Sequence, residues 1–176
     1  ILTRTVFGRR VYAVGGNESI QTLQSVNAAT TYLSPYALDR PGSGLDPNFN
    51  SLFYNLQLSG QSLARNAIYI LDGGGNDIGN FKVTDDASAA VVATNMVDAA
   101  NALKGRGAKY VVITNVPDFG LAPAGISVSE FATTMAGKVN SQIQQQVGGQ
   151  NILIFNAFSM IQEVVANPQA YGLPLT

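Results

Sequence analysis

Short apolar runs alternate with amphipathic segments along most of this 176-residue sequence. Three apolar runs, at residues 67–71, 110–114 and 152–155, predict buried strands. Between and after them, apolar residues recur at spacings of three and four, as expected of helices that bury one face. Alternation of this kind with short connections predicts a doubly wound α/β domain, in which a parallel sheet carries helices on both faces in three layers. We expect the three strands to be parallel neighbours in one sheet.

Start and stop signals delimit the helices that follow these strands. Thr-Asp-Asp at residues 84–86 is typical of a helix start, and Gly-Arg-Gly at residues 105–107 of a helix end. A second helix is predicted over residues 131–147, where apolar residues step by four up to Gly-Gly at 148–149. A last helix is predicted over residues 158–165.

The N-terminal third gives weaker signals. Apolar residues 11–14, Gly-Gly at 15–16 and Asn-Glu-Ser at 17–19 predict a strand, a glycine turn and a helix. Residues 30–50 are rich in Pro and Gly among polar residues and predict a surface loop. The apolar spacing over residues 49–63 predicts an amphipathic helix, whose aromatic stripe we expect to pack in the core.

Composition narrows the classes of function. The chain is 46% hydrophobic and 12% charged, which predicts a single globular domain over residues 1–176. Its net charge of -1 gives no electrostatic basis for binding nucleic acid or an anionic membrane surface. No apolar stretch reaches the length of a transmembrane helix, and residues 1–10 do not resemble a signal peptide. The chain has neither Cys nor His, so we expect no metal site and no imidazole base.

Gly-Gly-Gly at residues 73–75 ends the first of the three strands and is followed by Asn76 and Asp77. These polar side chains stand at the carboxyl end of a buried strand, where open α/β sheets bind their ligands. From the residues alone, Asn76 could bind a ligand or cap a following helix. A dinucleotide fingerprint would need glycine at position 78, where the chain has Ile78, and no phosphate-loop lysine follows. We therefore expect no nucleotide cofactor.

Three segments, in order, resemble the SGNH (GDSL) family of serine esterases and lipases. Gly-Gly-Asn-Asp at residues 74–77 resembles its third block, Gly-x-Asn-Asp. Tyr-Ala-Val-Gly-Gly at 12–16 resembles its second block, and Val-Ile-Thr-Asn-Val-Pro-Asp-Phe-Gly at 112–120 the strand and loop before its C-terminal half. The resemblance extends from about Val11 onward and is greatest to the bacterial secreted and autotransporter branch. It implies a flavodoxin-like fold, a small-molecule or lipid ester substrate, and a location outside the cell or at the bacterial outer membrane.

The resemblance also implies roles for three residues. The Gly16 N–H and the Asn76 side-chain amide would donate to the oxyanion of the tetrahedral intermediate, and Asp77 would brace the loop by bonding nearby backbone. Both donors must reach one oxygen at about 3 Å, so we expect their nitrogens within about 6 Å of each other. The chain departs from the family at Val11, where the second block usually begins with Asn.

Two blocks of the family are absent. No Gly-Asp-Ser-Leu lies upstream of Gly16, and no Asp-x-x-His follows later in the chain. We therefore expect a fragment that has no meaningful esterase activity, taken from a parent that hydrolyses esters through a serine acyl-enzyme. Ser19, Ser59 and Ser62 are the nearest candidates in sequence for an internal nucleophile, but none is predicted to lie on a strand-to-loop turn beside a base. A non-catalytic binding or structural module is the alternative function.

Overall fold

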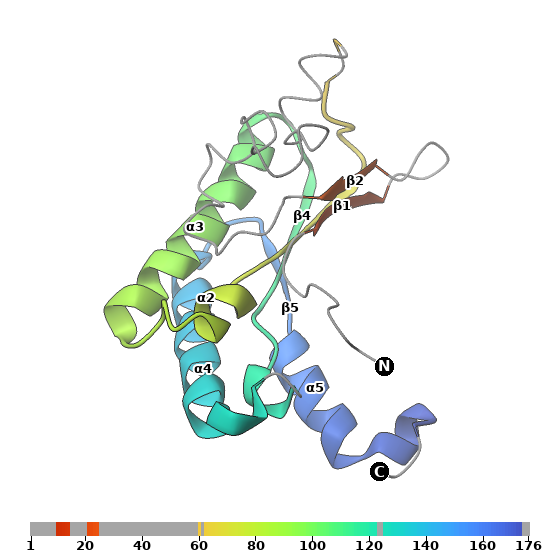
Figure 1. Cartoon of the computed structure of the whole chain (residues 1–176). Coiled ribbons are helices and arrows are strands. Elements are labelled where there is room, and N and C mark those ends of the chain that lie inside the picture. Colours follow the sequence, from red (N-terminus) through yellow and green to blue (C-terminus); the bar gives the residue numbers. More distant parts are fainter. Residues whose placement is uncertain (1–9, 15–20, 25–59, 61, 123–124, 174–176) are drawn as a thin grey trace.

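The computed structural model describes residues 10–14, 21–24, 60, 62–122 and 125–173 (Figure 1). Within these ranges, five strands form one sheet in the order β2-β1-β3-β4-β5. The strands are β1 (Arg10–Val14), β2 (Gln21–Gln24), β3 (Ile68–Asp72), β4 (Tyr110–Thr114) and β5 (Leu153–Phe155). The helices are α2 (Gly75–Gly79), α3 (Asp86–Gly105), α4 (Ser129–Gln146) and α5 (Ala157–Ala166), with 3-10 turns η3 (Phe119–Leu121), η4 (Ile126–Val128) and η5 (Pro168–Tyr171).

The strands β3, β4 and β5 are parallel neighbours. Ile68 pairs with Tyr110 and Asp72 with Thr114 between β3 and β4, and Val112 pairs with Leu153 between β4 and β5. The α/β class and the parallel order predicted for these three strands are therefore confirmed. The helices predicted after them are also present as α3, α4 and α5.

The other two strands make the sheet mixed. β1 runs antiparallel to both β3 and β2. The predicted strand at residues 11–14 is confirmed, but the helix expected after residues 17–19 is wrong, because Gln21–Gln24 forms a strand. The spacing of Ile20 and Leu23 is a single helical interval, too short a pattern to exclude a strand, and pairing with β1 satisfies the backbone groups of β2. The glycine turn at residues 15–16 lies outside the described residues.

One face of β3 and β4 forms the core. The buried side chains Tyr69, Leu71, Val111 and Ile113 point to this face, and α3 packs against it and against α4. Figure 1 shows α3 and α4 together on one side of the sheet. The core also includes apolar residues of both helices: Ala89, Val92, Ala93, Met96, Val97, Ala99, Ala100, Leu103, Ala132, Met135, Ala136, Val139 and Ile143.

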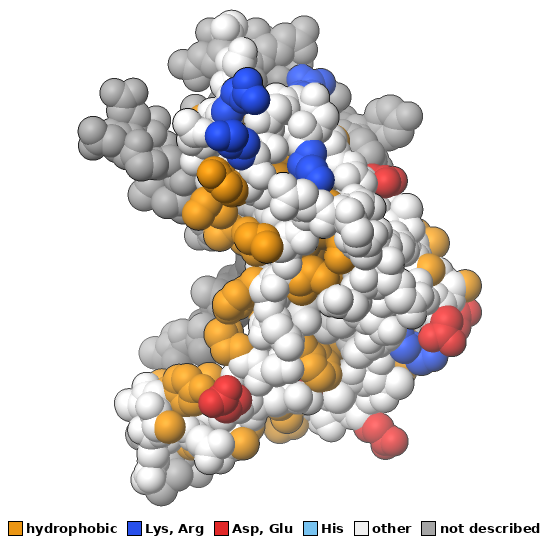
Figure 2. All heavy atoms as spheres, turned by 180° about the vertical axis from the view of Figure 1, so that it is seen from behind, with side chains coloured by type: hydrophobic (Ala, Val, Ile, Leu, Met, Phe, Trp, Pro, Cys, Tyr) orange, Lys and Arg blue, Asp and Glu red, His pale blue; other side chains and the backbone are white. Residues whose placement is uncertain are grey.

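The opposite face of the sheet is more exposed in the described part of the chain. Ile68, Tyr110, Leu153 and Phe155 are between 42% and 61% exposed. Hydrophobic side chains also gather along a hollowed side of the molecule (Figure 2). In the described part of the chain, the second helical layer that we predicted is thus not seen on this face of the sheet.

Two predictions for the segment before β3 fall largely outside the described residues. They are the loop over residues 30–50 and most of the helix over residues 49–63. Where this segment is described, at residues 62–67, it forms an irregular stretch and a turn, so the expected helix does not extend this far.

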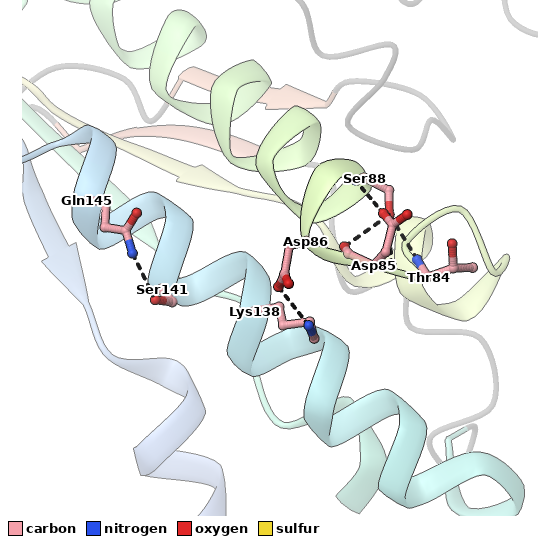
Figure 3. A network of polar contacts seen from close by, with 7 residues as sticks. All are labelled: Thr84, Asp85, Asp86, Ser88, Lys138, Ser141 and Gln145. Atoms are coloured by element: carbon pink, nitrogen blue, oxygen red, sulfur yellow. Dashed lines mark hydrogen bonds and ion pairs between the residues drawn. The ribbon is translucent and has the colours of Figure 1, made fainter.

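The start of α3 is fixed by a capping box (Figure 3). The Ser88 backbone N–H donates to Asp85 Oδ1 at 2.8 Å, and the Asp85 backbone N–H donates to Ser88 Oγ at 3.1 Å. The side-chain hydrogen bond from Ser88 lowers the pKa of Asp85. Lys138 of α4 forms an ion pair with Asp86 at 2.6 Å and so joins α4 to the first turn of α3. The helix start predicted at residues 84–86 is confirmed.

None of the described helices is both long and apolar enough to span a bilayer.

Candidate functional site

The candidate site begins where β3 ends. Gly74 has φ of 92°, a conformation that side chains with a Cβ rarely adopt, and it directly precedes α2. A Cβ at Gly74 would lie 2.6 Å from Val116 Cγ2, so the turn also needs glycine to let the loop after β4 approach. Gly73 and Gly74 thus join the carboxyl end of β3 directly to the start of α2.

Asn76 is the second residue of α2. The N-cap of this helix is Gly74, which makes no side-chain cap, so the alternative of Asn76 as the N-cap residue is wrong. The Asn76 Nδ2 atom is buried and has no hydrogen-bond partner in the described part of the chain. A buried polar group without a partner costs about 1–3 kcal/mol, so such groups in folded proteins call for an explanation such as a ligand.

Asp77 is fully buried beside it. Its backbone N–H donates to the Gly74 carbonyl at 3.2 Å, and its own carbonyl accepts from the Lys82 N–H at 2.7 Å. The backbone of Asp77 therefore ties α2 to the residues on both sides. The bracing role predicted for its side chain stays a prediction.

Asp72, the last residue of β3, is a feature that sequence reasoning missed. Burial raises the pKa of its carboxyl group from 3.8 to about 6. Because Asp72 stands one residue before the glycines, a partly desolvated acid adjoins the turn that carries Asn76. Its position after an apolar run was the signal that could have identified it.

The loop after β4 packs against this turn. Val116 is fully buried, and Asn140 of α4 bonds both of its backbone groups. Asn115 lies at the end of the same strand, and its amide donates to Asn156 Oδ1 at 3.0 Å while its own Oδ1 accepts from the Phe158 N–H. The loop is thereby held to α4 and to the start of α5.

Asp118 forms the second anchor of this loop. It is 3% exposed and accepts hydrogen bonds from the Gly120 N–H at 3.2 Å, Thr133 Oγ1 at 2.6 Å and Gln162 Nε2 at 2.9 Å. A buried carboxylate with three donors is well satisfied. Asn140, Thr133 and Gln162 were not predicted, because nothing in one sequence distinguishes them from other polar residues on helices.

The predicted partners of Asn76 are not brought to it in the described residues. Gly16 lies outside them, so its distance from Asn76 stays a prediction. Val14 of β1 pairs with Ile68, at the end of β3 remote from Asn76, and this pairing gives the prediction no support. Ser62 is exposed and precedes the amino end of β3, while Ser19 and Ser59 lie outside the described residues. No cluster of three or more acidic residues suited to a metal ion occurs in the described ranges.

The chain is similar to bacterial esterases. It is 31% identical over 92% of its length to a protein named Esterase EstA from Pseudomonas aeruginosa, and equally so to one from Pseudomonas putida. An uncharacterized protein of the trpE-trpG intergenic region of Pseudomonas putida is 29% identical over 92% of the chain. The chain spans only about a quarter of the length of these relatives, which is 25% for the two esterases and 27% for the third. No protein-family profile matches the chain. The likeness therefore joins this chain to one part of two longer proteins that are named as esterases.

Proposed function

Because the chain is similar over 92% of its length to two proteins named Esterase EstA, we propose that it is a segment of a carboxylic ester hydrolase of the SGNH (GDSL) type. The segment supplies the oxyanion hole and most of the sheet. These 176 residues contain neither the Gly-Asp-Ser-Leu block nor the Asp-x-x-His block of the family. The serine nucleophile and the histidine base therefore come from other parts of a longer protein. The substrate is a small-molecule or lipid ester, and the protein acts outside the cell or at the bacterial outer membrane.

The buried amide of Asn76 is the observation that carries this proposal. Attack on an ester carbonyl creates a negatively charged oxygen, and a fixed N–H donor stabilises it more than it stabilises the substrate. Asn76 Nδ2 meets the main requirements: it follows a parallel strand, it is held on a short helix, and no described residue uses it. Removing one such donor typically costs about 3 kcal/mol of transition-state stabilisation.

Two other residues complete the proposed site. The Gly16 N–H is the second oxyanion donor, and Asp77 braces the loop between the glycines and Lys82. Neither role needs a cofactor or a metal, since the chemistry is acyl transfer to serine and then to water.

A non-catalytic binding module is the second candidate function. It is favoured by one observation, the absence of histidine and of a Gly-Asp-Ser-Leu segment from the chain. An oxyanion hole stabilises only the charge that a nucleophilic attack creates, so without that attack Asn76 would bind a ligand and not catalyse a reaction.

The test compares the full-length protein with the 176-residue chain. The full-length protein should hydrolyse a p-nitrophenyl ester and be labelled by a fluorophosphonate probe, whereas the 176-residue chain should do neither. In the full-length protein, Asn76→Ala should lower kcat by about 100-fold to 1,000-fold. Asn101→Ala, at an exposed position of α3, is the matched control and should leave kcat unchanged.

Two outcomes would contradict the proposal in different ways. Stoichiometric labelling of a serine within residues 1–176 would show that the nucleophile lies inside this chain. An inert full-length protein would instead favour the binding module.

A further inference from the structure

Asn140 holds the backbone of the loop after β4 with both ends of its side-chain amide. Its Nδ2 donates to the Val116 carbonyl at 2.8 Å, and its Oδ1 accepts from the Val116 N–H at 2.7 Å. Val116 lies two positions after the last residue of β4. Asn140 thus makes, with its side chain, the two backbone hydrogen bonds that a neighbouring strand would make with a residue of a strand. The paired hydrogen bonds fix the position and the orientation of the Val116 backbone relative to α4.

The side chain of Val116 in turn lies against the turn that carries Asn76. A Cβ at Gly74 would be 2.6 Å from Val116 Cγ2, which means that the Gly74 backbone and the Val116 side chain are in close contact. Val116 is fully buried, and because protein interiors are closely packed we expect its side chain to have little room to move. The position of Val116 therefore limits where Gly74, and α2 after it, can lie.

The far end of α2 rests on the same loop. A Cβ at Gly79 would lie 3.3 Å from the Phe119 ring, and Phe119 follows the anchored Asp118. α2 has five residues, too few to form a stable helix by itself. Its placement must come from what it packs on, and both of its ends contact the loop that Asn140 and Asp118 hold.

We propose that Asn140 is a positioning residue for ester hydrolysis, which acts through Val116 and Gly74 to fix the Asn76 amide where the oxyanion forms. This inference rests on the proposed function. Oxyanion donors must be held within about 0.5 Å of their productive position, and a displacement of about 1 Å can cost about 100-fold in rate. A side chain that never touches the substrate can thus control kcat.

The first test uses Asn140→Asp in the full-length protein. Aspartate has the same shape and keeps an acceptor for the Val116 N–H, but it places an oxygen against the Val116 carbonyl where asparagine donates. We expect kcat to fall by about 10-fold to 100-fold with KM changed less than about twofold. The matched control is Gln146→Ala on the same helix. It removes the hydrogen bond that Gln146 accepts from Thr94 and the one that it donates to the Ala90 carbonyl, and it leaves the loop untouched. Its kcat should stay within about twofold of the wild type.

A double variant separates positioning from a general loss of structure. If Asn140 acts through Asn76, then Asn76→Ala combined with Asn140→Asp should be no slower than Asn76→Ala alone. Effects that multiply would overturn the inference, because they would show that Asn140 acts independently of Asn76.

A crystal structure of Asn140→Asp gives a readout that needs no activity. We expect Asn76 Nδ2 to move by at least about 0.5 Å relative to the backbone of β3. An Asn76 that stays in place would overturn the inference even in an inactive protein. If the wild-type protein does not hydrolyse esters, the proposed function fails, and this measurement still decides whether Asn140 positions Asn76.

Discussion

At the scale of single residues, three unusual features lie at the end of β3 and in the turn after it. Asp72 is buried enough to raise its pKa, Gly74 has a positive φ, and the Asn76 amide nitrogen has no partner among the described residues. The buried acid and the unpartnered amide lie within five residues, and such departures from what favours stability are typical of a functional site, because binding and catalysis need groups that the fold itself leaves unsatisfied.

Asp72 should make stability depend on pH. Burial raises the pKa of the Asp72 carboxyl group from its ordinary value of 3.8 to about 6 in the folded protein. Between these values the folded state holds a proton that the unfolded state has released, so stability falls as pH rises from about 4 to about 6 and stays lowered above that. The loss should be of the order of 3 kcal/mol at pH 7.

Urea unfolding of Asp72→Asn across this pH range checks the prediction. The variant should become more stable than the wild type as pH rises, with the difference appearing between about pH 4 and pH 6. Asp98→Asn makes the same charge change at an exposed position of α3 and is the control. Parallel stability curves for wild type and Asp72→Asn would contradict the prediction.

Gly74→Ala should destabilise the protein by at least about 2 kcal/mol. The new Cβ suffers both from the positive φ and from its approach to Val116 Cγ2. Gly149→Ala is the matched control, since Gly149 also has a positive φ of 76° but a Cβ there meets nothing within 4 Å. Chemical denaturation of both variants measures the difference, which isolates the contact with Val116. Equal losses in the two variants would show that this contact is not tight.

At the scale of elements, the helices are of two kinds. Some are specified by their own sequences, and others are specified by the residues that surround them. α3 and α4 have long apolar stripes, and α3 also has a capping box, so the periodicity and the start and stop signals of their own segments predicted them. α2 has five residues, no side-chain cap and no stripe, and it went unpredicted because its contacts with the loop after β4 hold it.

Gly137→Ala tests how far α4 is limited by its own propensity. Gly137 lies inside this helix, and a Cβ there meets no atom within 4 Å. Alanine should therefore raise the free energy of unfolding by about 0.5–1 kcal/mol, because it restricts the unfolded chain and favours the helix. Thermal unfolding gives the measurement. A lower midpoint than that of the wild type would mean that the helix needs glycine for a close contact.

At the scale of the whole molecule, the two faces of the sheet differ. α3 and α4 bury one face, while side chains on the other face are substantially exposed among the described residues. The stability of this chain should therefore depend much more on residues of the first face than on those of the second.

A pair of truncations on adjacent strands checks this asymmetry. Ile113→Ala, at a fully buried position of β4, should cost about 2–5 kcal/mol. Leu153→Ala, at a position of β5 that is 61% exposed, should cost well under 1 kcal/mol by the same urea unfolding. A loss of similar size at both positions would show that the second face is covered in solution.

The sequence by itself determined the elements whose information is local. The apolar runs predicted β3, β4 and β5, the stripes predicted α3, α4 and α5, and the glycines predicted the turn that presents Asn76. Each of these patterns is complete within one segment of the chain, because the periodicity of side chains follows from the geometry of a single helix or strand.

Only the tertiary structure decided the features that depend on distant partners. Asn140 reaches Val116 across 24 residues of sequence, and Gln162 reaches Asp118 across 44. The burial of Asp72 and the antiparallel course of β1 and β2 likewise depend on which segments become neighbours. Hydrogen bonds and desolvation act over a few ångströms in space, and a single sequence does not say which of its polar residues will come within that range.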